Sequence, residues 1–351
     1  MIGIDLFAGA GGMSLGAIQA GIEVSLAVEA DIHAALTYAR NHPRVRLFND
    51  DIRKLTASDV RKVRRGKDEL VVFGGPPCQG FSYSNQRTRS TANETNWLFL
   101  EFFRVVQLCK PDWIVFENVK GITNTEGGVF LEGVLRCLEK LRYNARHCIL
   151  NSLDFGIPQR RERFFVIASK TDVDRLQFRK SRKPAPPVND ALDDLPVLAN
   201  GASANWLAYG KNGCSSYARQ LRGRLQICPN HLVTRNAPFV LRRYRFVPPG
   251  GNWENIPERL MGNYFDRNRC HTGIYHRLHP QRPSMVIGNF RKNMLIHPSQ
   301  HRGLSVREAA RIQSFPDWYE FQGSIGFQQQ QVGNAVPPLL AKAVFDAILF
   351  V

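Results

Sequence analysis

The chain has no long hydrophobic run, and it begins without a recognisable targeting segment. No stretch approaches the ~20 consecutive apolar residues that a membrane-spanning helix needs, so we expect no membrane association. The first residues, 1–6, carry no basic region ahead of an apolar core. They are therefore expected to enter a strand directly and not to form a signal peptide.

Cysteine is scarce, and its spacing excludes several familiar classes of site. The seven cysteines contain no CxxC pair, and their odd number argues against a full disulfide framework, so a reducing cytoplasm is the expected compartment. One alternative stays open, because five potential zinc ligands fall in one region: Cys214, Cys228, His231, Cys270 and His271. Their spacing matches no familiar finger or ribbon, and we expect no metal.

Acidic residues are few relative to basic ones. The 47 Lys and Arg against 30 Asp and Glu give a formal net charge of +17. Such an excess favours a polyanionic partner, because binding releases condensed counterions, although charge alone does not separate DNA from RNA or from an anionic membrane. Hydrophobic residues make up 43% of the 351, which is enough for a core. The length suits one large domain plus a smaller one.

The first half of the chain alternates between strand-like and helix-like segments, the pattern of a doubly wound α/β domain. We predict strands at 3–7, 24–28, 71–73, 113–117 and 164–168, and helices at 95–109 and 130–141. Residues 1–170 are accordingly predicted to form the first part of a catalytic and cofactor-binding domain.

From about residue 171 to 270 the sequence is rich in turn residues and in clustered arginines interleaved with aromatic residues. This composition predicts a separate, loop-rich module that contacts nucleic acid, with these candidates: Arg219, Arg222, Arg242, Arg243 and Arg245. The α/β character is predicted to return over 271–351, where Ser305 and Glu308 form a capping box that opens a helix running to about Ser314.

One segment carries the strongest chemical signal. The apolar run 70–73 predicts a buried strand, and Gly74-Gly75-Pro76-Pro77-Cys78-Gln79-Gly80-Phe81-Ser82 follows it. Cys78 therefore lies just past a strand end, where open α/β sheets place reactive groups, and two prolines restrict the backbone before it. The polar stretch that continues to Thr95 is predicted to be a mobile loop.

A second signal predicts a nucleotide-like ligand. Residues 5–12 turn from the first predicted strand into a helix, and their glycines permit both a tight turn and close approach of a ligand to the backbone. The turn is not a dinucleotide GxGxxG fingerprint. Glu29 ends the second predicted strand and can accept both ribose hydroxyls, while Asp51 and Ile52 fall where a third strand should end and can contact an adenine ring.

These segments, together with Glu117-Asn118-Val119, residues 159–163 and residues 331–338, resemble in their order the motifs of the bacterial DNA (cytosine-5-)-methyltransferases of restriction-modification systems. The resemblance implies a Rossmann-like, S-adenosylmethionine-dependent fold with a mixed, mostly parallel sheet, plus a smaller target recognition domain at 171–270. It implies that Cys78 attacks C6 of a flipped-out cytosine and that Glu117, with a raised pKa in a dry pocket, donates to N3. Arg163 would contact O2 and steady Glu117, with Arg161 supporting.

The resemblance also implies a cofactor site, whose product would be S-adenosylhomocysteine. Its residues would be Asp5, Phe7, Ala8, Gly9, Gly11, Gly12, Glu29, Ala30, Asp51, Ile52, Pro76, Leu98, Asn334, Ala335 and Val336. One position departs from the family pattern: relatives often have a large apolar residue where this chain has Ala30. The adenine contact would then depend more on Phe7 and Ile52.

Double-stranded DNA is the implied partner, bound by a monomer that works beside a restriction endonuclease without a stable complex, in a bacterial cytoplasm. The loop 79–95, with Ser84, Arg87 and Arg89, would close over the extruded base. One alternative is a tRNA cytosine-5 methyltransferase of the same fold, but the Cys-Phe-Thr signature of those enzymes is missing here. A catalytically silent DNA-binding scaffold is another, and it predicts loss of Cys78, Glu117, Arg163 or the glycine turn, all of which are present.

Overall fold

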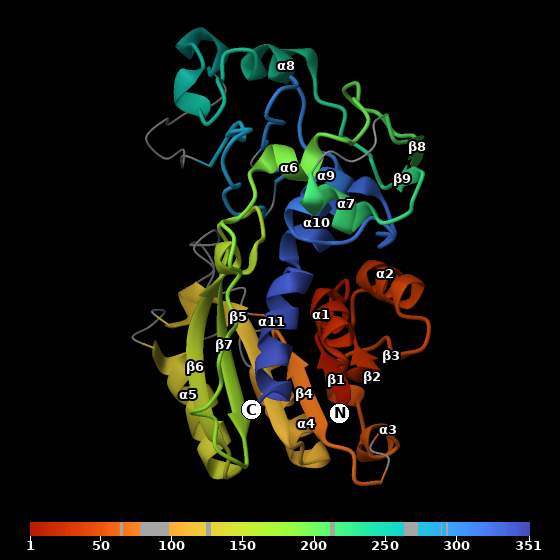
Figure 1. Ribbon diagram of the computed structural model, residues 1–351, viewed down its shortest axis with the longest axis vertical. Helices are drawn as coiled ribbons and strands as arrows, with labels where there is room; N and C mark the ends of the chain where they lie inside the picture. Colours follow the sequence, from red (N-terminus) through yellow and green to blue (C-terminus); the bar gives the residue numbers. More distant parts are fainter. Residues whose placement is uncertain are drawn as a thin grey trace. The chain divides into compact units, whose positions relative to one another are not determined.

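The computed structural model describes residues 1–63, 66–77, 98–123, 128–210, 215–262, 273–288, 290–292 and 294–351. The chain divides into two compact units (Figure 1). The first unit comprises Met1–Asn151, Glu162–Lys180 and Pro338–Val351, and the second comprises Ser152–Arg161 and Ser181–Pro337. This differs from the predicted division, because residues 273–337 group with the recognition segment and only the last helix returns to the first unit.

A seven-stranded sheet forms the centre of the first unit, in the order β3-β2-β1-β4-β5-β7-β6. The five strands β1 to β5 run parallel to one another, whereas β7 is antiparallel to both β5 and β6. The predicted α/β class with a mixed, mostly parallel sheet is therefore confirmed. The strands are β1 (Ile2–Leu6), β2 (Glu23–Val28), β3 (Arg46–Phe48), β4 (Leu70–Gly74), β5 (Trp113–Val119), β6 (Asn144–Asn151) and β7 (Glu162–Ser169).

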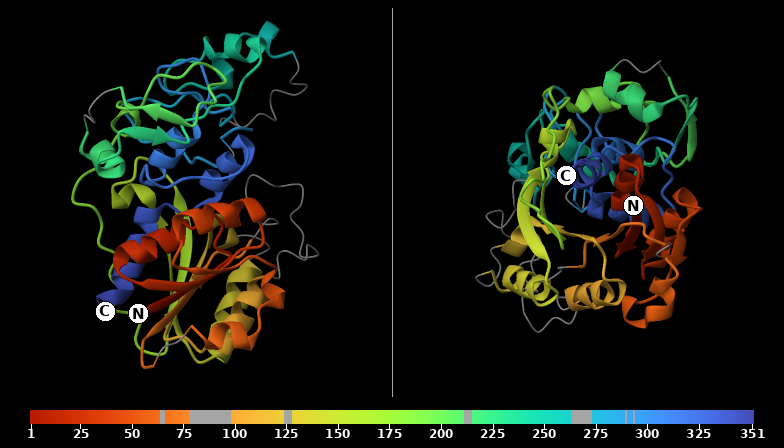
Figure 2. Two further views of the ribbon diagram at one scale, coloured as in Figure 1. Left: turned by 90° about the vertical axis from the view of Figure 1, so that its right-hand side faces the viewer. Right: turned by 60° about the horizontal axis from the view of Figure 1, so that its bottom comes forward.

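Helices cover both faces of this sheet (Figure 2). They are α1 (Gly12–Ala20), α2 (Ile32–Asn41), α3 (Ala57–Arg61), α4 (Leu98–Cys109), α5 (Val129–Lys140) and α11 (Pro338–Leu349), with short 3-10 turns at Ile52–Lys54 and Lys120–Thr123. Side chains from α3, α4 and α5 join the main hydrophobic cluster on one face. On the other face Phe345 of α11 meets Phe73 of β4, with ring centroids 4.9 Å apart.

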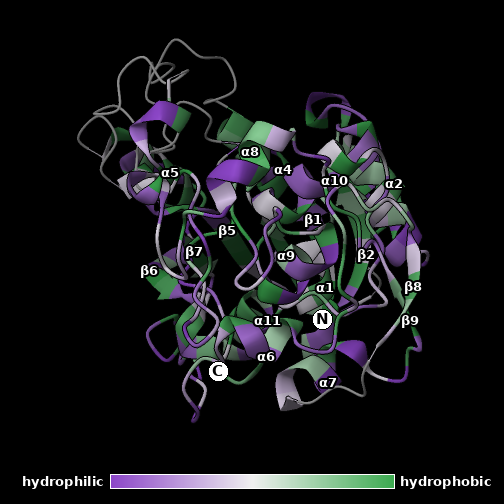
Figure 3. Cartoon of the chain, turned by 90° about the horizontal axis from the view of Figure 1, so that it is seen from above, coloured by the Kyte–Doolittle hydropathy of each residue, from purple (hydrophilic) through white to green (hydrophobic). Residues whose placement is uncertain are grey.

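The sequence of β1 explains why the side chain of Asp5 is buried on one face of the sheet. Hydrophobic residues concentrate in the strands of the sheet (Figure 3), and all five residues of β1 are buried because helices cover both faces. Alternation places Ile2, Ile4 and Leu6 in the main cluster, so Gly3 and Asp5 point to the opposite face. Asp5 is therefore the one acidic side chain of β1 on the α1 side of the sheet.

Helices α1 and α11 pack at unusually close range, and a glycine permits it. A Cβ added at Gly16 would lie 2.5 Å from the Ala341 Cβ and 2.6 Å from the Pro338 carbonyl oxygen. Real Cβ atoms do not approach so closely, so any side chain here would push the two helices apart. Gly16 thus allows the middle of α1 to pack directly on the first turn of α11.

The second unit is built from short elements. They are α6 (Val188–Leu192), β8 (Trp206–Ala208), α7 (Ser216–Arg222), β9 (Ile227–Pro229), α8 (Pro238–Tyr244), α9 (Val306–Ile312) and α10 (Ile325–Asn334), with 3-10 turns at Ser152–Phe155, Trp253–Asn255 and Glu258–Leu260. Strands β8 and β9 pair with each other, antiparallel. The predicted capping box at Ser305 is confirmed, since its hydroxyl accepts from the Glu308 N–H and the Glu308 carboxylate accepts from the Ser305 N–H.

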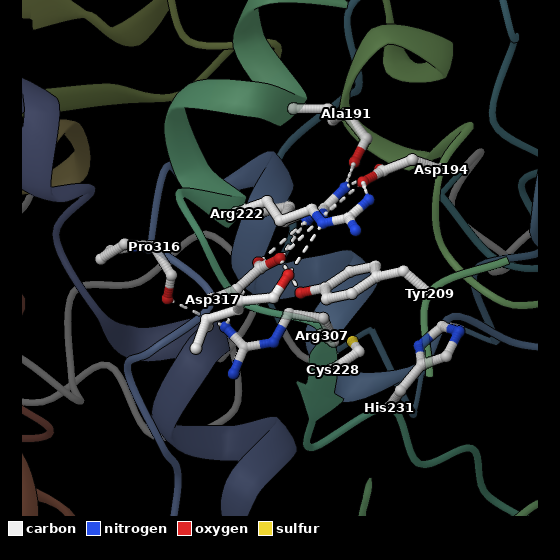
Figure 4. A network of polar contacts seen from close by, with 12 residues as sticks. Ala191, Asp194, Tyr209, Arg222, Cys228, His231, Arg307, Pro316 and Asp317 are labelled. Atoms are coloured by element: carbon white, nitrogen blue, oxygen red, sulfur yellow. Dashed lines mark hydrogen bonds and ion pairs between the residues drawn. The ribbon is translucent and has the colours of Figure 1, made fainter. Parts of the chain in front are cut away.

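A buried ionic network holds the elements of the second unit together (Figure 4). Arg311 of α9 binds Asp317 through two nitrogens, the closer contact being 2.6 Å, and it also pairs with Asp194. The Tyr209 hydroxyl donates to Asp317, and the Arg222 guanidinium lies 3.9 Å above the Tyr209 ring. Removing one charge from such a network leaves its partner buried and unpaired, which typically costs several kcal/mol.

The segment Ile325–Leu349 meets the length and composition criteria for crossing a membrane, with a mean hydropathy of 1.3. However, 61% of its most apolar window is buried inside the protein. It comprises α10 and α11, whose bounds are separated by residues 335–337, and α11 packs on α1. Buried helices of water-soluble proteins satisfy the same criteria, so this segment reads as part of the core.

Candidate active site and cofactor site

An acid–arginine pair forms where β5 and β7 lie side by side. Glu117 of β5 and Arg163 of β7 are neighbours because the two strands are antiparallel, with Glu117 opposite Phe165 and Val119 opposite Arg163. The Arg163 Nε lies 2.9 Å from the Glu117 Oε1, and the two residues are only 9% and 8% exposed. The contact that the sequence predicted between these side chains is therefore present.

The segment that leads to Cys78 is fixed by its neighbours up to Pro77. Strand β4 ends at Gly74, where an added Cβ would lie 1.9 Å from the Leu6 carbonyl oxygen of β1. At Gly75 an added Cβ would lie 2.4 Å from the Glu117 Oε2. The Asn118 amide donates to the Pro76 carbonyl at 3.1 Å. Gly74 thus brings this segment against β1, whereas Gly75 and Asn118 bring it against β5, with Gly75 beside the Glu117 carboxylate.

Cys78 itself, with Gln79–Trp97, lies outside the described residues. Four other cysteines are described, and none of them forms a disulfide with another described cysteine. Burial raises the pKa of each thiol, to about 12 for Cys109 and Cys228 and about 11 for Cys148, with Cys137 shifted in the same direction. Because the thiolate is the nucleophilic form, these four side chains are poor candidates for covalent catalysis.

The predicted glycine turn joins β1 to α1 in a strained backbone path. Phe7, Gly9 and Gly11 all have positive φ, at 59°, 55° and 85°. Such values cost little for glycine but are uncommon for a phenylalanine, and strain of this kind concentrates at ligand-binding sites. The path is held in place where the Ala8 N–H donates to the Val28 carbonyl and the Gly11 N–H to the Ala8 carbonyl.

Glu29 follows β2 and binds the glycine turn directly. Its Oε2 accepts from the Gly9 N–H at 2.7 Å, and its Oε1 accepts from the Asp31 N–H at 2.7 Å. Burial raises the pKa of Glu29, against the opposing effect of these hydrogen bonds. Each carboxylate oxygen has a second lone pair, so both retain the capacity to accept from a ligand hydroxyl. Ala30 is exposed beside it.

Asp51 and Ile52 are differently engaged from the prediction. The Asp51 carboxylate caps the turn that follows it and binds Arg53 at 2.6 Å, and this hydrogen bond lowers the pKa of Asp51 to about 2. Ile52 is buried in the main hydrophobic cluster. The assignment of adenine contacts to these two positions stays a prediction.

Arg161 lies in the second unit, where its guanidinium binds backbone. It donates to the carbonyls of Ile287 at 3.0 Å, Gly333 at 2.8 Å and Ala335 at 3.0 Å. The side chain is fully buried, and its bonds fix the turn after α10 that contains Asn334. Arg161 therefore supports this turn, and its predicted support of Arg163 stays a prediction.

Two of the arginines predicted to contact DNA are buried, which corrects that assignment. The Arg222 guanidinium belongs to the Tyr209 network, and Arg243 donates to the Leu260 carbonyl and the Tyr275 hydroxyl at 2.7 Å each. Their charges are used inside the second unit. Arg219, Arg242 and Arg245 are exposed, whereas Ser84, Arg87 and Arg89 lie outside the described residues.

His231, one of the five potential zinc ligands, is already engaged by hydrogen bonds. Both ring nitrogens of His231 are engaged, with the Ser305 hydroxyl and the Pro196 carbonyl at 2.8 Å each. Within the described ranges no group of three His, Cys, Asp or Glu side chains could hold a metal ion, while Cys214, Cys270 and His271 fall in the gaps between those ranges.

Sequence reasoning missed the residues that support Asp5 and Glu117. Asp5 was found, but its partners Ser14 and Tyr38 were not; Ser14 donates to the Asp5 Oδ2 at 2.6 Å and lies 2.6 Å from the Tyr38 hydroxyl. The role of Gly75 was also missed. The doubled glycine before the prolines is a signal for close backbone approach, whereas nothing in the sequence marks Tyr38.

Comparison with known proteins agrees with this geometry. A prophage-encoded E. coli protein described as a DNA modification methyltransferase superposes with a TM-score of 0.81 and 26% identity, covering 100% of this chain and 99% of its own. A type II methyltransferase of Haemophilus parahaemolyticus is 36% identical over 99% of this chain and 86% of its own length. Another, from Desulfomicrobium norvegicum, is 32% identical over 98% and 88%.

The fold and the relatives thus define a methyltransferase. Residues 1–349 match the family described as C-5 cytosine-specific DNA methylase. The chain belongs to that family, and the resemblance seen in its motifs is confirmed.

Proposed function

We propose that the protein transfers a methyl group from S-adenosylmethionine to C5 of a cytosine that is flipped out of a specific short site in double-stranded DNA. The observation that carries the proposal is the Glu117–Arg163 pair, held by Gly75 and Asn118 against the backbone that leads to Cys78. A buried carboxyl group paired with a guanidinium group, next to the segment that leads to Cys78, suits a reaction in which charge develops on a bound ring.

The chain's residues would act in sequence on the cytosine. The Cys78 thiolate adds to C6, and the electron pair of the C5–C6 double bond moves toward the N3–O2 edge. Glu117 donates a hydrogen bond or proton to N3, and Arg163 holds Glu117 while presenting guanidinium protons to O2. After C5 has been methylated, its proton passes to a base such as a water molecule, and Cys78 leaves C6 to restore the aromatic ring.

S-adenosylmethionine supplies an electrophilic methyl group when bound. The residues present fit it, because Glu29 retains acceptor capacity for ribose hydroxyls and because the Asp5 Oδ1 is buried with no hydrogen-bond partner among the described residues. A buried acceptor without a donor is costly unless a ligand provides one, and the cofactor's ammonium group does so. The resemblance also assigns Asn334, Ala335 and Val336 to the cofactor, and Arg161 fixes the turn that contains them.

For DNA we propose the exposed side of α8 and the turn after it. Phe239 and Phe246 are 45% and 42% exposed, and Arg242 and Arg245 are exposed between them. Arginines that neutralise phosphates and aromatic rings that meet bases or sugars are a common combination in nucleic-acid recognition. The protein would act as a monomer in a bacterial cytoplasm, beside a restriction endonuclease that it does not bind stably.

The covalent step has a direct test. Duplex DNA in which the target cytosine carries fluorine at C5 is incubated with the protein and cofactor, because fluorine cannot leave as the proton does and the adduct accumulates. We expect a protein–DNA species that survives denaturation, with the DNA mapped by mass spectrometry to Cys78. Cys78→Ala should bind DNA yet form none of this species. An adduct at another residue would contradict the assignment of the nucleophile.

A further inference from the structure

A chain of three buried hydroxyl and carboxyl groups lies behind the glycine turn. Asp5 of β1 is 1% exposed, and Ser14 of α1 and Tyr38 of α2 are fully buried. The Ser14 hydroxyl donates to the Asp5 Oδ2 at 2.6 Å, and its oxygen lies 2.6 Å from the Tyr38 hydroxyl. Because the single Ser14 proton is used on Asp5, the Tyr38 hydroxyl must be the donor to Ser14.

Several titratable groups lie near this chain. Burial raises the pKa of Asp5 to about 8, opposed by the Ser14 hydrogen bonds and reinforced by the charge of Glu29. The His42 ring lies at a tilt to the Tyr38 ring, with centroids 4.6 Å apart, and burial lowers the pKa of His42 to about 4, so it is neutral at pH 7. On α11, which packs against α1, Lys342 is paired with Asp346 at 2.6 Å.

The two oxygens of Asp5 are treated differently. Its Oδ2 is bound by Ser14, whereas its Oδ1 is buried and has no hydrogen-bond partner in the described part of the chain. A carboxyl group serving only the fold would be expected to have both oxygens satisfied. The hydrogen bonds that run from Tyr38 to Ser14 and from Ser14 to Asp5 favour the ionised form of Asp5. They therefore prepare its carboxylate to bind a cation.

We infer that Ser14 and Tyr38 are positioning residues that hold the Asp5 carboxylate for the ammonium group of the cofactor's methionine part. The inference rests on the proposed use of S-adenosylmethionine. It has a consequence for protons: free Asp5 is mostly protonated at neutral pH, and a bound ammonium group stabilises its ionised form, so binding releases a proton to solvent. Below pH 7 the affinity should therefore rise about tenfold per pH unit.

The rise should not continue indefinitely. An α-amino group has an ordinary pKa near 8. As the pH rises through this value, the ligand loses its positive charge over the same range in which Asp5 gains its negative charge. The affinity should accordingly level off around pH 8 and fall above it. A ligand without the amino-acid part has no ammonium group and should bind with little pH dependence over the same range.

Calorimetry with two ligands tests this inference. S-adenosylhomocysteine carries the ammonium group, and 5′-methylthioadenosine has the same nucleoside without it. The variants are Ser14→Ala and Tyr38→Phe, and Ser169→Ala is the control, because Ser169 is also buried in the first unit but pairs with Thr171. Measurements at pH 6.5 in buffers of different ionisation enthalpy should give release of about one proton on binding S-adenosylhomocysteine.

We expect Ser14→Ala to lower the affinity for S-adenosylhomocysteine about tenfold and Tyr38→Phe to lower it about threefold. The affinity of both variants for 5′-methylthioadenosine should be unchanged, and Ser169→Ala should bind both ligands like the wild-type protein. Equal weakening of both ligands would mean that Ser14 serves only the fold and would overturn the inference. Unchanged affinity in both variants would overturn it as well. In either case the wild-type protein would still bind S-adenosylhomocysteine, so the proposed function would stand. Failure of the wild-type protein to bind either ligand would instead contradict the proposed cofactor.

Discussion

Gly75→Ala is the substitution whose effect follows most directly from the geometry. The new Cβ would lie 2.4 Å from the Glu117 Oε2, whereas ordinary contacts begin at about 3.4 Å, so one of the two atoms must move by about 1 Å. The carboxylate is the end of a flexible side chain, and it will move before the backbone does. The Glu117–Arg163 contact at 2.9 Å would then lengthen or rotate.

This displacement should affect chemistry far more than stability. A misplacement of about 1 Å in a reacting group can lower a rate about 100-fold, whereas the free energy of unfolding should change by less than about 1 kcal/mol because no core atom is displaced. Rapid-quench measurement of one methyl-transfer turnover, with protein in excess over DNA, isolates the chemical step. Gly262→Ala is the matched control, since a Cβ there meets no atom of the described residues within 4 Å.

Combining Gly75→Ala with Glu117→Gln sharpens the test. If the alanine acts only by moving the Glu117 carboxylate, the two changes share one cause and their effects on the rate should not add. We expect less than a threefold further loss when Gly75→Ala is made in the Glu117→Gln protein. Full additivity, or an unchanged turnover rate in Gly75→Ala alone, would refute the reasoning that places Glu117 in the chemical step.

Three further outcomes are expected. Glu117→Gln should slow the single-turnover rate at least 100-fold with cofactor affinity unchanged by calorimetry, and a pure binding defect would contradict its role. Arg242→Ala and Arg245→Ala should each reduce the slope of log affinity against log salt by about 1 in DNA-binding titrations, and an unchanged slope would mean that α8 does not contact phosphates. Gly16→Ala should lower the free energy of unfolding by about 2 kcal/mol, whereas Gly133→Ala, whose Cβ would make ordinary contact, should leave it equal or higher.

Much of the first unit could be predicted from sequence because its strands are buried on both faces and read as apolar runs. The five predicted strands all exist, and each observed strand extends at least to within one residue of its predicted bounds. Strand β3 was located only by its end, since it has three residues, and β6 was missed because it is a largely exposed edge strand with polar residues along its length. Strand order depends on long-range pairing, which local periodicity does not encode.

The second unit shows the opposite situation. Its clustered arginines predicted a DNA-binding surface, but Arg222 and Arg243 turn inward to bind carbonyls, rings and a carboxylate. Runs of like charge do not reveal which side of a short helix is buried. Helix α9 was likewise predicted as part of the returning α/β domain, whereas its buried Arg311 and Arg307 bind the recognition segment through Asp194 and the Pro229 carbonyl.

The candidate site was predictable where chemistry fixes residue identity. Glu117 and Arg163 were named from their motifs, and the structure brings them together. The supporting residues were not predictable, because Ser14 meets Asp5 and Tyr38 meets Ser14 only when α1 and α2 fold onto the same face of the sheet.

The central claim is that this protein methylates cytosine at C5 within a defined DNA site. The most direct measurement is to incubate it with labelled S-adenosylmethionine and duplex DNA of mixed sequence, and then to map 5-methylcytosine by bisulfite sequencing. The account predicts methylation at one short recurring site, with tRNA unmethylated under the same conditions. Absence of 5-methylcytosine from duplex DNA while the cofactor is bound, or equal methylation of tRNA, would contradict it.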